Sequence, residues 1–151
     1  MINNIINLIS PGLFEETARY VCFYILLKTN PINRDKKTSV SYGIGHGGIE
    51  CMLLSIQDLI VIIDKEFAIE NQILIDDITF LDCLIYCIVR SILVIVHISF
   101  SVLVFKAINE KKILFYILAI IIHDFIDLFG LLYLWGIINI HISELIVTFI
   151  L

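Results

Sequence analysis

Five long apolar segments constrain what this chain can fold into, because each approaches the length of a membrane-spanning helix. They cover roughly residues 11–29, 39–63, 82–106, 112–133 and 135–151, and the last is the shortest. A helix needs about 20 predominantly apolar residues to cross the hydrocarbon core. Hydrophobic residues make up 60% of the chain, whereas soluble domains have about 45–50%, and the runs are too long for barrel strands. The sequence therefore predicts an all-α, polytopic transmembrane bundle of about five helices.

The charges of the connecting loops predict how these helices are oriented. Lysine and arginine dominate residues 30–39 and 106–112, whereas residues 64–82 carry six acidic side chains against one lysine. Positively charged loops stay on the cytoplasmic side of a membrane. We therefore expect the N-terminus outside, residues 30–38 inside, residues 64–81 outside and residues 106–112 inside.

Ionisable side chains of four segments are expected at one depth in the membrane. Counted from the cytoplasmic edges at about 1.5 Å per residue, their heights fall between about 12 and 22 Å. The residues are Glu15, Glu16, Arg19, His46, Glu50, His97, His123 and Asp127. A charge that faces lipid costs at least about 2.5–3.5 kcal/mol, so these side chains should turn inward. The sequence thus predicts a four-helix core around a buried polar cavity.

Spacing along each helix suggests partners for these side chains, because residues three or four apart share a helix face. The pairs are Glu15 or Glu16 with Arg19, His46 with Glu50, and His123 with Asp127. Ionisable residues inside membrane spans are candidates for a functional site. Any one pair taken alone could instead be structural and hold two helices together.

Gly43 and Gly47 form a GxxxG pattern around His46. Small residues allow helix backbones to approach closely, so two interpretations are open. The glycines could serve helix packing, or they could leave room beside His46 for water or a substrate backbone. Gly45 and Gly48 lower helix propensity, which predicts a local distortion near His46.

Three histidines and several carboxylates at one depth suit a divalent cation, Zn²⁺ in particular. Zinc binds neutral imidazole nitrogens and carboxylate oxygens, and a catalytic site keeps one position for water. Water bound there ionises near neutral pH and becomes a nucleophile, and a carboxylate that is not a ligand can accept its proton. Glu15 and Glu16 point about 100° apart on a helix, so we expect them to have different roles. The HExxH motif of many zinc proteases is absent.

Four stretches on successive helices carry a family resemblance: EETAR, GIGHGGIE, RSILVIVHISFSVLVF and IIHDFID. In this order, over about residues 11–130, they resemble the YhfC family of intramembrane metalloproteases. That family is similar to the PrsW-type and CAAX-prenyl-protease-type (CPBP) membrane proteases. The wider group shares a double glutamate followed by a basic residue, a histidine or glutamate on the next helix, and a late HxxxN or HxxxD. The basic residue here follows the double glutamate by three positions, as in the YhfC type.

The resemblance implies a role for each of these eight ionisable residues. The catalytic residues would be Glu15, Glu16, Arg19, Glu50 and Asp127, with one of the two adjacent glutamates activating water. The metal ligands or oxyanion stabilisers would be His46, His97 and His123. The cofactor would be a divalent metal, Zn, and the substrate a membrane-associated protein or peptide in the bacterial cytoplasmic membrane.

Two other functions are open at this stage. A transporter or ion-binding protein could use the same buried carboxylates and histidines to carry protons or a divalent metal. A catalytically silent scaffold of the same fold could bind a partner within the bilayer. The net charge of −5 and the lack of a basic patch argue against a nucleic-acid partner. Relatives carry further helices ahead of the glutamates, so we expect residues 1–151 to form a single transmembrane domain cut from a longer protein.

Overall fold

The described part of the chain is entirely helical. The computed structural model describes residues 2–30, 35–63, 80–139, 142 and 146, and no strand occurs among them. The helices are α1 (Ile2–Thr29), α2 (Lys36–Ile63), α4 (Phe80–Asn109) and α5 (Leu114–Leu134). The predicted all-α bundle is confirmed, and the helix bounds lie within three residues of the predicted segments, apart from the start of α1.

The predicted start of the first helix, residue 11, is wrong because α1 begins at Ile2. Hydropathy marks the part of a helix that is apolar, whereas the first turns of α1 contain asparagines and are nonetheless helical. Pro11 lies inside α1 rather than before it. The predicted fifth segment, 135–151, lies largely outside the described residues, as does most of the acidic loop.

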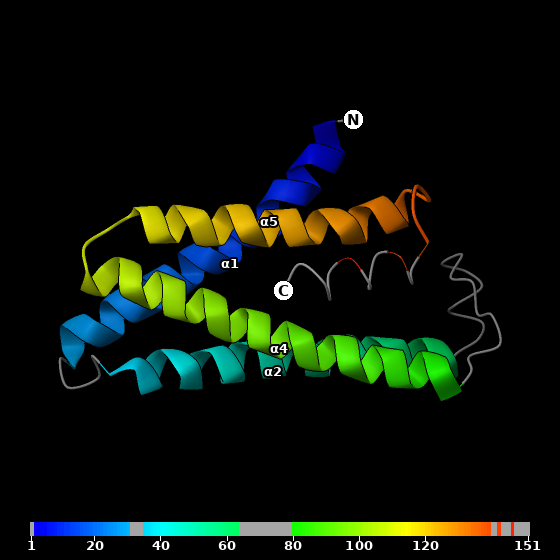
Figure 1. The fold of residues 1–151 in the computed structure, drawn as a ribbon, viewed down its shortest axis with the longest axis horizontal. Coiled ribbons are helices and arrows are strands. Elements are labelled where there is room, and N and C mark those ends of the chain that lie inside the picture. Colours follow the sequence, from blue (N-terminus) through cyan, green and yellow to red (C-terminus); the bar gives the residue numbers. More distant parts are fainter. Residues whose placement is uncertain (1, 31–34, 64–79, 140–141, 143–145, 147–151) are drawn as a thin grey trace.

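The four helices run in alternating directions, as repeated crossing of a membrane requires (Figure 1). The end of α1 and the start of α2 lie at the same end of the bundle as the connection after α4. Lysines flank both connections: Lys28, Lys36, Lys37, Lys106, Lys111 and Lys112. The two lysine-rich loops therefore share one end of the molecule, as the charge pattern predicted.

The central helix of the bundle is α4, which packs against α1, α2 and α5, while α1 also packs against α5. The core cluster consists of aliphatic and aromatic side chains: Phe23, Leu27, Val96, Phe100, Val104, Phe105, Ala119 and Ile126. Most of these lie between the lysine-bearing end and the ionisable residues. Counted from the lysine-bearing end, the ionisable residues therefore begin one to two helical turns beyond the apolar core.

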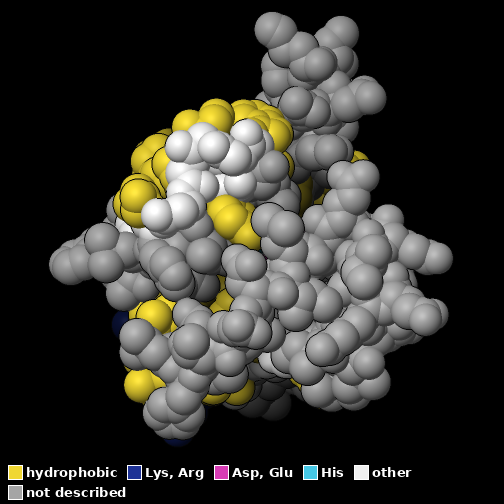
Figure 2. Space-filling model, turned by 90° about the vertical axis from the view of Figure 1, so that its right-hand side faces the viewer, with side chains coloured by type: hydrophobic (Ala, Val, Ile, Leu, Met, Phe, Trp, Pro, Cys, Tyr) yellow, Lys and Arg dark blue, Asp and Glu magenta, His cyan; other side chains and the backbone are white. Residues whose placement is uncertain are grey.

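The outer faces of all four helices are apolar. Exposed examples, one from each helix in chain order, are Phe14, Ile49, Ile95 and Ile121. On the end of the bundle shown in Figure 2, the visible described side chains are mostly hydrophobic. Two stretches are long and apolar enough to span a membrane, Leu84–Asn109 in α4 and Leu114–Tyr133 in α5. The described helices form a helical membrane bundle, with polar residues and glycines in the middle of α1 and α2.

Gly43 and Gly47 bring α2 close to α4. A Cβ atom on Gly43 would lie 2.5 Å from the Cα atom of Ile98, and one on Gly47 would lie 3.0 Å from the Cβ atom of His97. A larger residue at either position would push the two helices apart. Close helix packing therefore accounts for the GxxxG pattern.

Gly45 and Gly48 have no such role, since a Cβ atom on either would meet nothing within 4 Å. The predicted distortion near His46 is wrong, because α2 is an uninterrupted α-helix over Lys36–Ile63. Contacts along the α2–α4 seam hold the helix together despite the low helix propensity of its glycines.

Candidate metal centre

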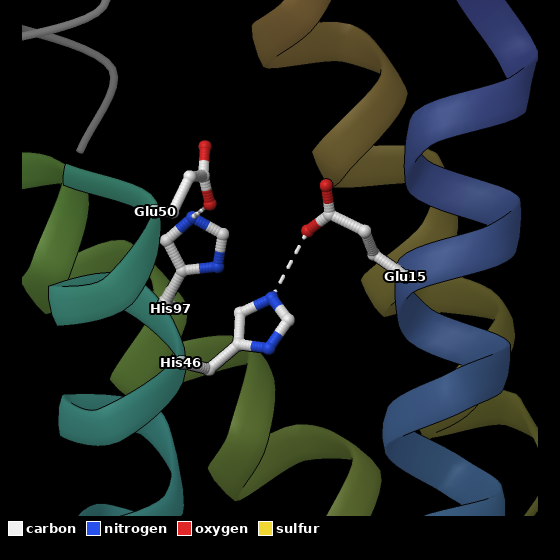
Figure 3. Close-up of side chains that lie close together, drawn as sticks. All are labelled: Glu15, His46, Glu50 and His97. Atoms are coloured by element: carbon white, nitrogen blue, oxygen red, sulfur yellow. Dashed lines mark hydrogen bonds and ion pairs between the residues drawn. The ribbon is translucent and has the colours of Figure 1, made fainter. Parts of the chain in front are cut away.

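Four side chains with metal-binding groups converge from three helices (Figure 3). Glu15 comes from α1, His46 and Glu50 from α2, and His97 from α4. One ligand atom of each lies within 4.8 Å of those of the other three. His46 Nε2–H donates to Glu15 Oε2 at 3.2 Å, and Glu50 Oε2 lies 2.6 Å from His97 Nε2. We call these four residues the metal-sized group.

Glu15 and His46 join α1 to α2 across the metal-sized group. Among the described helices, α1 and α2 are not a closely packed pair, so they meet here through side chains. Both side chains keep part of their surface exposed, 32% for Glu15 and 28% for His46. A second molecule can therefore approach the group on this side.

A fully buried ion pair lies beside the metal-sized group. Arg19 Nη1 donates to Glu16 Oε1, and both side chains are inaccessible to solvent. His123 on α5 donates from Nδ1 to the same oxygen at 2.8 Å. Arg19 Nη2 donates to His97 Nδ1 at 3.1 Å. The Glu16–Arg19 pair therefore connects α1 to both α4 and α5.

These hydrogen bonds set the tautomers of two histidines in opposite senses. Arginine can only donate, so His97 accepts at Nδ1, and a neutral ring carries its proton on Nε2, towards Glu50. A carboxylate can only accept, so His123 carries its proton on Nδ1, and a neutral ring presents a lone pair at Nε2. A carboxylate on the opposite ring nitrogen is the usual partner of a metal-binding histidine.

Glu50 does not pair with His46, its expected partner one turn away. Glu50 contacts His97 across the α2–α4 seam, while His46 contacts Glu15 on α1. Both are contacts between helices, which the spacing within a single helix cannot reveal. Of the two adjacent glutamates, only Glu16 bonds to Arg19, so the pair is divided between two environments as the 100° offset predicted.

His123 and Asp127 lie at the edge of the metal-sized group. His123 Nε2 is 3.7 Å from Asp127 Oδ2 and 3.9 Å from Glu15 Oε2. The family resemblance implied that all three histidines are metal ligands or oxyanion stabilisers of one site. In the structure, the other two histidines converge with two glutamates, and His123 adjoins them.

Two aromatic residues that the sequence did not single out hold the imidazole rings. Phe100 stacks on His123 with ring centroids 4.9 Å apart, and Tyr42 stacks on His46 at 6.0 Å. Tyr42 precedes His46 by one turn, and Phe100 follows His97 by one turn. Helix spacing could therefore have identified Tyr42, whereas the contact of Phe100 with His123 joins α4 to α5 and no spacing within one helix encodes it.

The donor set fits a divalent cation. Two imidazoles and two carboxylates are ligands that Zn²⁺ accepts. Glu50 Oε2 is buried and forms no hydrogen bond with any described residue, although it lies 2.6 Å from His97 Nε2. To bind a metal through Nε2, a neutral His97 would have to carry its proton on Nδ1 and give up the hydrogen bond from Arg19.

The sequence of this chain is similar to that of one protein family and of one bacterial membrane protein. A family model described as YhfC intramembrane metalloprotease matches residues 2–147. The "Uncharacterized membrane protein YhfC" of Bacillus subtilis (strain 168) is 27% identical over 147 residues, which cover 85% of this chain and 56% of that protein. The chain thus spans about half the length of the curated relative it matches. No solved structure matches the chain.

Proposed function

The chain belongs to the YhfC intramembrane metalloprotease family, and from this premise we propose that it is a metal-dependent endopeptidase. Its substrate would be a membrane-associated protein or peptide, and its location the cytoplasmic membrane of a bacterium. The observation that carries the proposal is the metal-sized group, in which glutamates and histidines from three helices converge within 4.8 Å. Family membership supports the peptidase activity, and the Bacillus relative supports the bacterial membrane.

The residues that would hold the metal are His46, His97 and Glu50. Two imidazoles and one carboxylate make three protein ligands, which leave one position of a tetrahedral zinc ion free. Zinc is the proposed ion because nitrogen and carboxylate donors in this number are typical of catalytic zinc sites. When bound, it would polarise the scissile carbonyl and acidify water.

Glu15 is the proposed proton acceptor. Its carboxylate is 32% exposed and faces His46, so it can meet both water and substrate. Glu16 cannot take this role, since Arg19 and His123 both bond to it in a fully buried position. A general base must lie within hydrogen-bond reach of the proton that it accepts. We therefore assign proton transfer to Glu15, and to Glu16 the orientation of its neighbours.

The orientation of the bundle forms part of the proposal. We propose that the N-terminus lies outside and that the lysine-rich loops 30–38 and 106–112 face the cytoplasm. The support is that the helix ends flanking both loops lie at one end of the bundle (Figure 1), which the positive-inside rule assigns to the cytoplasm.

Metal content and cleavage, measured on the same purified full chain in detergent, test the proposed function. Wild type should hold zinc and cleave a mixture of fluorogenic transmembrane peptides. Glu15→Gln should retain zinc and lose cleavage by about 10²-fold or more, as expected for a general base. His46→Ala should lose both zinc and cleavage. Glu110→Gln is the matched control, because this glutamate pairs with Lys112 at the lysine-bearing end.

The result that would contradict the proposal is a zinc-loaded wild type without peptidase activity. If that protein moved zinc or protons across vesicles instead, and His46→Ala abolished the flux, the ion-transport interpretation would replace it. Cleavage that survives both site variants would show that the activity comes from elsewhere.

A further inference from the structure

His123 carries a ring nitrogen that the metal-sized group does not use. Its side chain is only 8% exposed, and Nδ1–H donates to Glu16, so a neutral ring directs a lone pair from Nε2. No described residue hydrogen-bonds to Nε2, and the nearby carboxylate oxygens are Asp127 Oδ2 at 3.7 Å and Glu15 Oε2 at 3.9 Å. Both distances exceed a hydrogen bond. A lone pair and two negative oxygens repel each other unless a proton on Nε2 or a metal cation lies between them.

The distances from His123 Nε2 to the two carboxylate oxygens approach those between ligands of one cation. Zinc binds imidazole nitrogen at about 2.0–2.1 Å and carboxylate oxygen at about 2.0–2.2 Å, so two donors on one ion lie roughly 3.0–3.6 Å apart. The two distances from His123 Nε2 exceed this range by only a few tenths of an ångström. Small side-chain rotations of Glu15 and Asp127 would close the difference.

The His123 ring is held in the direction that this requires. Glu16 bonds to the far nitrogen, which is the usual second contact of a metal-bound histidine. Phe100 stacks almost parallel to the ring, at 4.9 Å and 11°. Glu16 is itself fixed by Arg19, so the orientation of the ring depends on buried groups rather than on the exposed side of the site.

The charges of the site can also accommodate a second divalent cation. Glu15, Glu50 and Asp127 provide three carboxylates, and Arg19 does not offset them because it is paired with Glu16. One divalent cation neutralises two of these charges and leaves the third to be compensated by a protonated histidine or by a second cation. A second cation compensates the third and leaves one positive charge to attract an oxygen of the substrate.

We propose that the site binds a second divalent cation, held by His123 and Asp127, with Glu15 Oε2 lying between the two cations. This inference rests on the proposed function, whose single cation keeps the ligands given above. Glu15 keeps its proton-accepting role, because its contacts with the two histidines both use Oε2 and leave Oε1 for the proton. The second position suits divalent cations that bind both nitrogen and oxygen ligands, such as Zn²⁺ and Mn²⁺.

Metal stoichiometry of the full chain tests this site without reference to activity. Wild type equilibrated with Zn²⁺ should hold two ions per chain, and Asp127→Asn should hold one, with at least tenfold weaker binding of the other. Asp124→Asn is the matched control: this carboxylate lies on the same helix but meets Gly12 of α1, so two ions should remain. Electron paramagnetic resonance of the Mn²⁺-loaded chain should show a coupled pair in wild type and an isolated ion in Asp127→Asn.

The possible outcomes distinguish failure of the second cation site from failure of the proposed function. One ion per wild-type chain, or two ions in both Asp127→Asn and wild type, overturns the second position and leaves the proposed function standing. No bound ion in wild type overturns both. If Asp127→Asn does not fold, His123→Gln removes the same position, and the wild-type stoichiometry and Mn²⁺ spectrum decide without any variant.

Discussion

Gly43→Ala should destabilise the protein by forcing α2 away from α4. The added Cβ atom would lie 2.5 Å from the Cα atom of Ile98 and 3.0 Å from the carbonyl oxygen of His97, whereas ordinary contact begins at 3.4 Å. The obstructing atoms belong to backbone, so no side chain can turn aside. The helices must therefore separate by roughly 1 Å. Overpacking of this kind lowers the free energy of unfolding by about 1–3 kcal/mol.

The same displacement should reach the candidate site, because its contacts cross the α2–α4 seam. Glu50 Oε2 lies 2.6 Å from His97 Nε2 across that seam. A displacement of about 1 Å at catalytic groups costs on the order of 10²-fold in rate. Gly43→Ala should therefore lower zinc affinity and peptide cleavage together, although Gly43 meets the backbone of His97 and not its imidazole ring.

Gly45→Ala and Gly48→Ala, on the same helix, should have the opposite effect on stability. A Cβ atom at either position meets nothing within 4 Å, so the change should stabilise α2 by about 0.5–1 kcal/mol through helix propensity. Unfolding in detergent, followed by circular dichroism against heat or added SDS, measures all three variants. The reasoning fails if Gly43→Ala is as stable as wild type, or if the three alanine variants lose stability equally.

Two further predictions concern the buried ion pair and the orientation of the bundle. Arg19→Met should destabilise the protein by about 3–5 kcal/mol, because it leaves the Glu16 carboxylate buried without a partner, and adding Glu16→Gln should restore part of the loss in the same unfolding assay. An Arg19→Met variant that is more stable than the double variant would contradict this. In a background without the native cysteines, Lys111→Cys should react with a membrane-impermeant maleimide only after the cells are opened, whereas Glu70→Cys should react in intact cells. Reaction of Lys111→Cys in intact cells would reverse the proposed orientation.

The fold could be predicted from the sequence because its main determinants are local and additive. Long apolar runs specify where helices lie, and lysine-rich loops specify how the helices alternate. The start of α1 escaped prediction for the same reason, since hydropathy reports contact with lipid and not helix formation. The asparagine-bearing turns around Asn3 and Asn7 are helical without being apolar.

The sequence singled out the four residues that converge in the metal-sized group, whereas it could not predict their partners. Counting residues from the membrane edge gives the depth of Glu50 and His97 but not the rotation of their helices. Rotation depends on which faces pack, and here Gly47 places α2 directly against His97. Glu50 consequently meets His97 instead of His46, a contact that no spacing within α2 encodes. Hydrogen-bond directions at His123 depend in the same way on Glu16, which lies on another helix.

The hydrogen bonds of Arg19 show what a buried guanidinium does in this bundle of apolar helices. Its two terminal nitrogens bond to different helices, Nη1 to Glu16 on α1 and Nη2 to His97 on α4. A lysine ammonium lacks this planar fork and would not hold both partners in fixed directions. Through Glu16 the same pair fixes His123, so one ion pair orients two histidines through opposite tautomers. The buried charge therefore serves to direct imidazole nitrogens, which a hydrophobic replacement of equal volume could not do even if it were more stable.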